Sequence, residues 1–260
     1  YKASKLYSVL PTNGDGDFTT SRASVATRVN ENGLIEEVAS NVPRLDYSDG
    51  TCPSLLLEPT ATNLVTYSED FSNAYWTKNG SSVTSGFASL KGDTSAFKLA
   101  EDTSASAHYC FTQTGVSVSV GDITYKTIFV KPNGRTWVLL FDASTSDGYF
   151  FDIVNKVIGG TSGGTPLDYI IEEFSDGWVR IGISSATTTT ASKLGIYLAS
   201  SDGVLGYTGD GTSGIYIYGA QLEENSYATS YIKTVGTAQT RTADTATGSG
   251  NSTVINSSEG

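Results

Sequence analysis

Methionine is absent from the 260 residues, and the sequence contains only one histidine and two cysteines. Because position 1 is Tyr and no Met occurs anywhere, we expect an excised part of a longer chain. Two cysteines are too few for a disulfide framework, and the spacing of Cys52 and Cys110 matches no metal motif. We interpret them as two small buried thiols, with a single Cys52–Cys110 disulfide as the alternative.

Charged residues are also scarce, at 17% of the chain, and acidic ones predominate. The 16 Lys and Arg against 27 Asp and Glu give a formal charge of −11. Such a chain repels phosphate backbones, which argues against nucleic acid as a partner. No apolar run reaches the roughly 18 residues of a membrane span, and residues 1–10 lack the pattern of a signal peptide. We therefore expect no nucleic-acid binding and no membrane insertion.

The signature motifs of several enzyme classes are missing. The sequence has no GxSxG, P-loop, GxGxxG, HExxH or EF-hand pattern. Glycoside hydrolysis needs a pair of carboxylates, but Glu172 and Glu173 are adjacent on a predicted strand and point to opposite faces. A polysaccharide lyase would gather Arg180, Gln221 and Tyr218, with His108 unplaced, and this is the alternative to our expectation that the chain is not an enzyme.

The residues that are abundant favour strands. Gly numbers 28, Tyr 15 and Phe 10, and Ser and Thr together make up about a quarter of the chain, a composition that disfavours helices. Short runs separated by Gly, Asp and Asn predict an all-β, antiparallel β-sandwich (jelly roll) of about ten strands, with at most one short helix, at 68–76. The predicted strands are 82–90, 96–100, 108–114, 123–130, 136–142, 149–154, 169–174, 178–184, 193–199 and 214–222.

Composition along the chain predicts three parts. Residues 1–60 have little periodicity and are interpreted as an N-terminal connector or docking segment. Residues 61–245 form the predicted carbohydrate-binding-like β-sandwich domain. Residues 246–260 have almost no large apolar side chains and predict a linker to a following domain that this sequence does not contain.

Alternation along three strands suggests a binding face. Aliphatic side chains such as Ile181, Ile196 and Ile217 occupy one side of each strand, and aromatic or hydrogen-bonding side chains occupy the other. Flat rings stack on the C–H faces of sugars, and Arg or Gln side chains bond sugar hydroxyls. The predicted carbohydrate-binding residues are Trp178, Arg180, Tyr197, Tyr216, Tyr218 and Gln221. Packing in the core or between subunits is the alternative for each of these aromatic side chains.

Other candidates have structural interpretations. Trp137 shares a side of its strand with Leu139 and Phe141 and is interpreted as core or interface, with ligand contact as the alternative. Trp76 is interpreted as a plug and His108 as a structural residue. No cofactor is expected, and Asp93, Glu101 and Asp102 are interpreted as a solvated acidic loop. A structural calcium ion held by these three carboxylates is the alternative.

Several segments together carry a family resemblance. The segments are 21–30 (SRASVATRVN), 42–63 (VPRLDYSDGTCPSLLLEPTATN), 68–76 (SEDFSNAYW), 177–181 (GWVRI), 207–223 (YTGDGTSGIYIYGAQLE) and 228–244 (ATSYIKTVGTAQTRTAD). In these stretches the chain resembles bacteriophage virion fibre and head-spike proteins whose modules have a carbohydrate-binding-module-like jelly roll. The closing segment 256–260 (NSSEG) resembles the entry to a following laminin-G or concanavalin-like domain in such proteins.

The resemblance implies a binding or display module on the virion exterior. It implies no catalytic residues, and it makes the GW and GAQLE motifs fold-defining elements. We therefore expect a glycan-adhesion module whose partner is a polysaccharide or cell-surface glycan, with a homotrimer as one arrangement of the full-length protein. The alternatives are a module appended to a secreted polysaccharide-degrading enzyme and a purely structural virion module. The net charge of −11 makes neutral glycans the first expectation.

Overall fold

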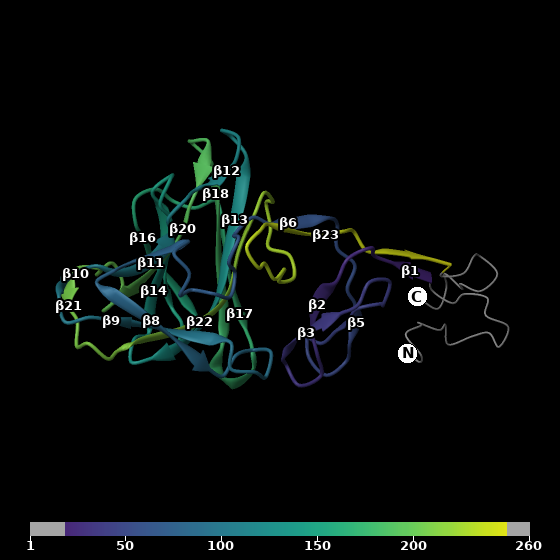
Figure 1. The fold of residues 1–260 in the computed structure, drawn as a ribbon, viewed down its shortest axis with the longest axis horizontal. Coiled ribbons are helices and arrows are strands. Elements are labelled where there is room, and N and C mark those ends of the chain that lie inside the picture. The colour runs from purple at the N-terminus through teal and green to yellow at the C-terminus, as the bar shows by residue number, and fades with distance from the viewer. Residues whose placement is uncertain (1–18, 249–260) are drawn as a thin grey trace. The chain divides into compact units, whose positions relative to one another are not determined.

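The computed structural model describes residues 19–248, which fall into two compact units (Figure 1). Of the described residues, unit 1 contains 19–61, 229–231 and 240–248, and unit 2 contains 62–228 and 232–239. The expected domain entry at 256–260 and most of the predicted linker at 246–260 lie outside the described residues, as do residues 1–10. Residues 229–231 and 240–245, which composition assigned to the sandwich, belong to unit 1.

Unit 2 consists of two six-stranded antiparallel sheets. Sheet A has the order β16 (Val157–Thr161), β15 (Asp147–Asp152), β14 (Trp137–Asp142), β20 (Leu194–Ala199), β11 (His108–Thr112) and β7 (Trp76–Asn79). Sheet B has the order β17 (Asp168–Glu173), β18 (Val179–Ala186), β13 (Ile123–Asn133), β22 (Gly214–Glu223), β9 (Ala96–Glu101) and β8 (Ser81–Phe87). The chain passes between the sheets repeatedly, from β9 to β11, β13 and β14 in turn. The predicted antiparallel β-sandwich of jelly-roll type is confirmed.

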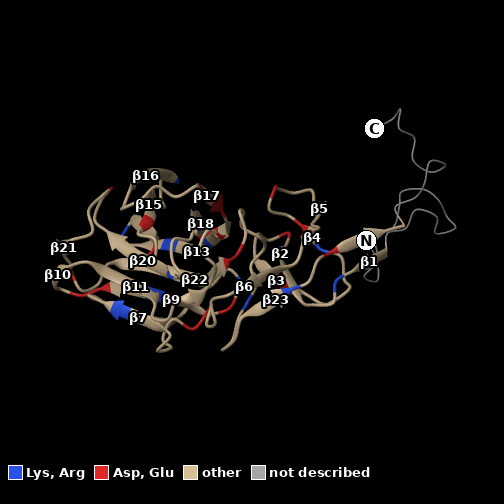
Figure 2. Cartoon of the chain, turned by 90° about the horizontal axis from the view of Figure 1, so that it is seen from above, with Lys and Arg blue, Asp and Glu red and all other residues tan. Residues whose placement is uncertain are grey.

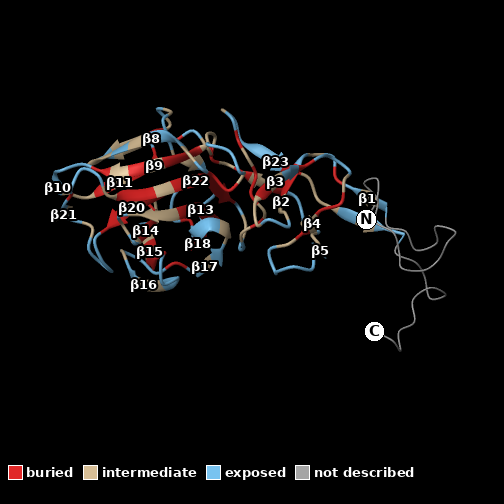
Figure 3. Cartoon of the chain, turned by 90° about the horizontal axis from the view of Figure 1, so that it is seen from below, coloured by how far each residue is buried: buried red, intermediate tan, exposed pale blue. Residues whose placement is uncertain are grey.

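The core lies between the two sheets and is mainly aliphatic. Ile181, Ile196 and Ile217 are fully buried in one cluster, as the alternation pattern predicted. Figure 3 shows buried residues along the middle strands β9, β11, β20 and β22, whereas the edge strands are more exposed. Trp76 is 1% exposed and donates its indole N–H to the carbonyl oxygen of Tyr67 over 2.9 Å, so the plug interpretation is confirmed.

Short strand pairs complete unit 2. They are β10 (Ala105–Ser106) with β21 (Tyr207–Thr208) and β12 (Val116–Ser117) with β19 (Ala191–Ser192). The chain crosses from one unit to the other within β6 (Ala61–Asn63) and within β23 (Gln239–Arg241).

The helical turn predicted at 68–76 is wrong. The Asp70 side chain accepts a hydrogen bond from the backbone N–H of Ser72, and the Asn73 side chain accepts one from the backbone N–H of Tyr75. Such turns compete with a helix because the side chains take up backbone N–H groups. Within residues 19–248 the one helical element is the 3-10 turn Ser175–Gly177. No helix in this range is long and apolar enough to cross a membrane.

Unit 1 contains three two-stranded pairs. These are β1 (Thr19–Ser21) with β24 (Thr245–Thr247), β2 (Ala26–Val29) with β3 (Ile35–Val38), and β4 (Leu45–Asp46) with β5 (Ser54–Leu55). The segment expected to be an irregular connector therefore forms strand pairs of its own.

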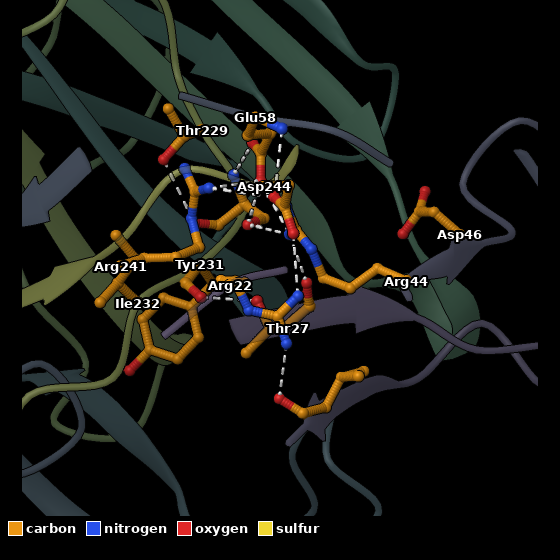
Figure 4. A network of polar contacts seen from close by, with 12 residues as sticks. Arg22, Thr27, Arg44, Asp46, Glu58, Thr229, Tyr231, Ile232, Arg241 and Asp244 are labelled. Carbon is orange, nitrogen blue, oxygen red and sulfur yellow. Dashed lines mark hydrogen bonds and ion pairs between the residues drawn. The ribbon is translucent and has the colours of Figure 1, made fainter. Parts of the chain in front are cut away.

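A buried ionic network lies inside unit 1 (Figure 4). Arg22, Arg44 and Arg241 are at most 2% exposed. Arg22 pairs with Asp244 over 2.9 Å, and Arg44 pairs with Glu58 over 2.8 Å and also with Asp244. Because unpaired buried charges are costly, these carboxylates are structural partners of the arginines.

The two cysteines are free thiols. Cys110 is buried in the core of unit 2, as interpreted from the sequence, whereas Cys52 in unit 1 is exposed, which corrects the interpretation of both as buried. Burial raises the pKa of the Cys110 thiol to about 12.

Candidate functional site

The predicted binding residues do not share one face. Tyr197 lies on β20 of sheet A, whereas Arg180, Tyr216, Tyr218 and Gln221 lie on β18 and β22 of sheet B. The strands of both sheets turn aliphatic side chains to the same core, so their other sides form two outer faces that point away from each other. The prediction of a single aromatic face was therefore wrong.

Three side chains at the outer side of sheet B are buried and engaged within unit 2. Trp178, which precedes β18, is 2% exposed, and Tyr218 and Gln221 are fully buried. The Tyr218 hydroxyl donates to Glu69 over 2.9 Å. The Gln221 side chain donates to Glu223 over 2.8 Å and accepts the backbone N–H of Ile232 over 2.7 Å. These side chains therefore present no surface to a ligand.

Arg180 and Tyr216 also have partners within unit 2. Arg180 is 5% exposed, donates to Thr127 Oγ1 over 3.1 Å and lies 3.6 Å from a Glu172 oxygen. Tyr216 is partly exposed, but its hydroxyl accepts the Asn133 side-chain amide over 2.9 Å and its ring lies 4.8 Å from that of Phe87. Of the six predicted residues, only Tyr197 and Tyr216 reach the surface.

The outer side of sheet A carries a group of partly exposed aromatic side chains, here called the aromatic face. It consists of Tyr109, Phe111, Trp137, Phe141 and Tyr197, from β11, β14 and β20, which are adjacent strands. The Tyr109 ring centroid lies 4.5 Å from that of Tyr197 and 5.6 Å from that of Phe111. The Tyr197 ring lies 5.6 Å from Phe141. Four of the rings, those of Phe111, Tyr109, Tyr197 and Phe141, therefore form a continuous surface across three strands.

A second apolar layer supports the aromatic face. Leu139, Phe150 and Ala199 are at most 2% exposed, and Trp137, Phe141 and Tyr197 pack against them. These residues lie outside the main core, on the outer side of the same sheet. The partly exposed rings thus rest on a packed base.

Glycines allow two of the rings to lie close to the backbone. Aromatic residues and glycines alternate at paired positions across adjacent strands of sheet A. Gly195 pairs with Phe111 on one side and with Phe141 on the other, and Phe141 pairs in turn with Gly148. A Cβ atom at Gly195 would lie 3.0 Å from the Tyr197 ring, and one at Gly148 would lie 2.7 Å from the Phe141 ring. The rings therefore cover positions that have no side chain, in the manner of aromatic rescue of strand glycines.

The aromatic face also has hydrogen-bonding groups that are not used inside the protein. Within residues 19–248, the hydroxyls of Tyr109 and Tyr197 make no hydrogen bond, and the indole N–H of Trp137 has no acceptor. By contrast, the hydroxyls of Tyr125, Tyr207 and Tyr218 all bond carboxylates. Burial, with the neighbouring Tyr109, raises the pKa of Tyr197 to about 12, so its hydroxyl keeps its proton at neutral pH.

A cation lies at the β11 end of the aromatic face. The Lys193 ammonium is 5.7 Å from the centroid of the Phe111 ring, a cation–π distance. Figure 2 shows charged residues thinly scattered over the strands of unit 2, most of which is tan. The chemistry of the aromatic face is therefore dominated by rings and neutral hydrogen-bonding groups.

The candidate calcium ligands do not form a metal site. Asp93 bonds Ser89 and Ser95, and Asp102 bonds Ser104. Glu101 accepts two bonds of 2.6 Å from Arg135 and one of 2.8 Å from Tyr207. Among residues 19–248 no group of three or more His, Cys, Asp or Glu side chains has the arrangement to hold a metal ion.

His108 is fully buried, and its ring nitrogens lie 2.5 Å from the Gly80 carbonyl oxygen and 3.2 Å from that of Tyr207. It thus contacts backbone on both sides, as the structural interpretation requires. Arg180, Tyr218 and Gln221, the other members of the lyase hypothesis, are buried and engaged as described above.

Sequence reasoning missed most of the aromatic face. Tyr109 and Phe111 alternate with the buried Cys110 on β11, and Phe141 shares a side of β14 with Leu139 and Trp137, as predicted. The period-two signal was therefore present in both strands. What it could not supply was the adjacency of β11, β20 and β14 in one sheet.

No family model matches the chain, and no curated protein matches it either. Among solved structures, it is similar to the CBM22-1–GH10 modules of Clostridium thermocellum endo-1,4-beta-D-xylanase 10B complexed with xylohexaose. That match has 14% identity and a TM-score of 0.37, and covers 68% of this chain and 30% of that one.

Two further structures are similar at 14% identity. The CBM22-1 xylan-binding domain from Paenibacillus barcinonensis Xyn10C is matched over 64% of this chain and 94% of its own, with a TM-score of 0.35. The enzymatically active domain of tailspike protein 4 from bacteriophage CBA120 is matched over 62% of this chain and 21% of its own, with a TM-score of 0.37. With TM-scores below 0.5, these similarities carry no conclusion about function.

Proposed function

We propose that unit 2 is a non-catalytic glycan-binding module and that the aromatic face is its binding surface. The observation that carries this proposal is the combination of five partly exposed aromatic side chains with three hydrogen-bonding groups that have no partner within residues 19–248. Sugars offer C–H faces that stack on rings and hydroxyls that exchange hydrogen bonds. A surface that provides both kinds of contact suits a carbohydrate better than an apolar peptide.

The engagement of acidic side chains elsewhere supports a binding role without catalysis. Asp142 pairs with Lys126, Asp152 bonds Asn155, and Glu223 bonds Gln221. Glu172 and Glu173 pair with Arg180 and Lys156. A glycosidase needs one carboxyl to protonate the leaving group and a second to act as base or nucleophile. None of these carboxylates belongs to the aromatic face.

The sequence resemblance supports a place for this module on a phage fibre or spike. Its motifs resemble those of virion fibre and head-spike proteins over most of the chain. In such a protein, the module would adhere to a polysaccharide or glycan at the host surface. Reading the open reading frame on either side of these residues tests this placement, because a virion-attachment domain supports it and a polysaccharide-degrading domain contradicts it.

Affinity gel electrophoresis tests the glycan-binding function. The full chain is run through native gels that contain hydroxyethylcellulose, dextran or galactomannan, and a glycan array extends the panel. We expect at least one neutral glycan to retard the protein. Tyr197→Ala and Phe141→Ala should each weaken this retardation by about tenfold in affinity, since each removes a stacking ring and its contact area.

Tyr216→Ala is the matched control, because it removes the same side chain from a partly exposed position on sheet B. It should bind as the unaltered chain does. Absence of retardation by every glycan would reject the function, and equal retardation of Tyr197→Ala and the unaltered chain would reject the face. The structural alternative is that the aromatic face packs between subunits. It requires that the unaltered chain sediments as an oligomer and that this oligomer dissociates when Tyr197 or Phe141 is replaced.

A further inference from the structure

An acidic side chain lies at the Trp137 end of the aromatic face. Asp202 is in the loop between β20 and β21, where Ser200 and Val204 pair through a backbone hydrogen bond of 3.1 Å. One carboxylate oxygen of Asp202, Oδ1, accepts the backbone N–H of Gly160 on β16 over 2.8 Å. This bond fixes the carboxylate against sheet A, although the residue is exposed.

Gly159 shows how close this carboxylate is to the indole ring. A Cβ atom at Gly159 would lie 2.4 Å from Asp202 Oδ1 and 2.6 Å from Cζ3 of Trp137. The carboxylate and the ring therefore lie within about 5 Å of each other, over a residue without a side chain. The absence of a Cβ atom is what permits this approach.

The second carboxylate oxygen, Oδ2, has no partner within residues 19–248. The same is true of the Trp137 indole N–H. A carboxylate accepts hydrogen bonds strongly from hydroxyls, and an indole N–H only donates. This end of the aromatic face therefore offers an anionic acceptor beside the benzo edge of the Trp137 ring, while the indole N–H lies on the opposite edge of that ring.

The charge at this end is opposite to that at the other end. Asp202 is beside Trp137, whereas the Lys193 ammonium is beside Phe111, 5.7 Å from its ring centroid. A carboxylate attracts hydroxyl hydrogens but repels a carboxylate or sulfate on a ligand, and an ammonium does the reverse. The two ends of one surface thus discriminate differently between neutral and anionic sugar units.

We infer that Asp202 is a specificity-determining residue. Its carboxylate accepts hydrogen bonds from the hydroxyls of an uncharged sugar unit at Trp137 and excludes an anionic sugar unit there. Lys193, at the other end, admits an anionic sugar unit at Phe111. The ligand class is a neutral or sparsely acidic glycan. This inference rests on the proposed glycan-binding function of the aromatic face.

The test compares neutral polymers with their charged derivatives. Retardation of the full chain is measured in hydroxyethylcellulose, dextran and galactomannan and in the carboxymethyl derivative of each. The quantity compared is the affinity for the carboxymethyl polymer divided by that for its neutral parent. Asp202→Asn keeps an oxygen for the Gly160 N–H but removes the charge, and Lys193→Gln removes the opposite charge.

Asp202→Asn should raise this ratio by about fivefold, the factor for two unit charges roughly 4 Å apart in water. Lys193→Gln should lower it. The control is Asp49→Asn, an exposed site in unit 1 that changes the net charge by the same amount as Asp202→Asn and should leave the ratio unchanged. Equal melting temperatures of the variants confirm that each is folded.

The outcomes separate the two proposals. If the unaltered chain is retarded but Asp202→Asn has the same ratio, the specificity role of Asp202 is rejected and the glycan-binding function stands. If Asp49→Asn raises the ratio as much as Asp202→Asn, net charge explains the effect and the inference also fails. If no polymer retards the unaltered chain, both the function and the inference are rejected.

Discussion

Lys126 on β13 and Asp142 on β14 form an ion pair of 2.7 Å between the two sheets of unit 2, and both side chains are fully buried. Lys126 also donates to Thr124 Oγ1 over 2.7 Å, and Asp142 accepts bonds from Ser192 and the Ser144 backbone. Each charge is thus paired and hydrogen-bonded. Such a pair contributes little net stability relative to apolar residues, but breaking it leaves a buried charge without its partner.

Lys126→Met should therefore destabilise unit 2 by about 3–5 kcal/mol, because it leaves the Asp142 carboxylate buried without its counter-ion. The double variant Lys126→Met, Asp142→Leu should recover at least half of that loss. Urea denaturation followed by tryptophan fluorescence measures both, since Trp76, Trp137 and Trp178 are all in unit 2. A single variant as stable as the unaltered chain would contradict the role of the pair.

The stability of unit 1 should fall in acid. Burial alone would raise the pKa of both the Glu58 and the Asp244 carboxyl. The Arg241 and Arg44 charges and the Ser230 hydrogen bonds outweigh burial for Glu58 and hold its pKa below the ordinary 4.5. Hydrogen bonds from Arg44 and Arg22, with the Arg44 charge, do the same for Asp244, whose pKa lies below the ordinary 3.8. A folded-state pKa below the unfolded value gives stability that is present above the unfolded pKa and lost as pH falls through the folded one. The loss should begin near pH 4.5 and grow as the pH is lowered.

Calorimetry from pH 7 to pH 3 measures this loss, with tryptophan fluorescence identifying the transition of unit 2. Arg44→Gln is the informative variant, because it removes a cation that contacts both carboxylates. It should lower the melting temperature of unit 1 at pH 7 and make it less dependent on pH. The same pH slope in Arg44→Gln and the unaltered chain would show that the network does not control acid stability.

Gly195→Ala should weaken glycan binding more than it weakens folding. The new Cβ atom would lie 3.0 Å from the Tyr197 ring and 3.4 Å from the Phe141 carbonyl oxygen, so the ring must move away from the sheet. We expect a loss of stability of about 1 kcal/mol and a larger loss of glycan affinity. Gly206→Ala is the control, since a Cβ atom there meets no atom within 4 Å. Unchanged affinity in Gly195→Ala would mean that the position of the Tyr197 ring is unimportant.

The two thiols should differ sharply in reactivity. Burial raises the pKa of Cys110 to about 12 and also shields it, whereas Cys52 is exposed. We expect Ellman's reagent to titrate one thiol per native chain and two after unfolding in guanidinium chloride. Cys52→Ser should abolish the native reaction. A native reaction that persists in Cys52→Ser would mean that the core around Cys110 opens to solvent.

Much of the fold could be predicted because its strongest signal is local. The alternation of Val179, Ile181 and Ile183 with other residues is visible in the sequence, and all three are buried between the sheets. Turn residues at short intervals marked most strand ends. The two-residue alternation of apolar side chains along a strand indicates which of them face the core, and this prediction was correct in both sheets.

The candidate site was harder to predict because it depends on pairing between distant strands. Alternation does not reveal that β20 lies in sheet A while β22 lies in sheet B, so Tyr197 and Tyr218 looked equivalent. Nor does it reveal that Glu69, 149 residues earlier in the chain, accepts the Tyr218 hydroxyl. Long-range contacts of this kind determine which strand aromatics remain at the surface.

The glycines beneath the aromatic face have a consequence for the energetics of association. Rings that already rest on Gly148 and Gly195 lose little conformational entropy when a ligand covers them, whereas ordering a mobile side chain at a binding surface costs about 0.5–1.5 kcal/mol. The aromatic face is in this sense preorganised. Its affinity for a glycan is then limited by desolvation and by the flexibility of the sugar chain rather than by ordering of the protein.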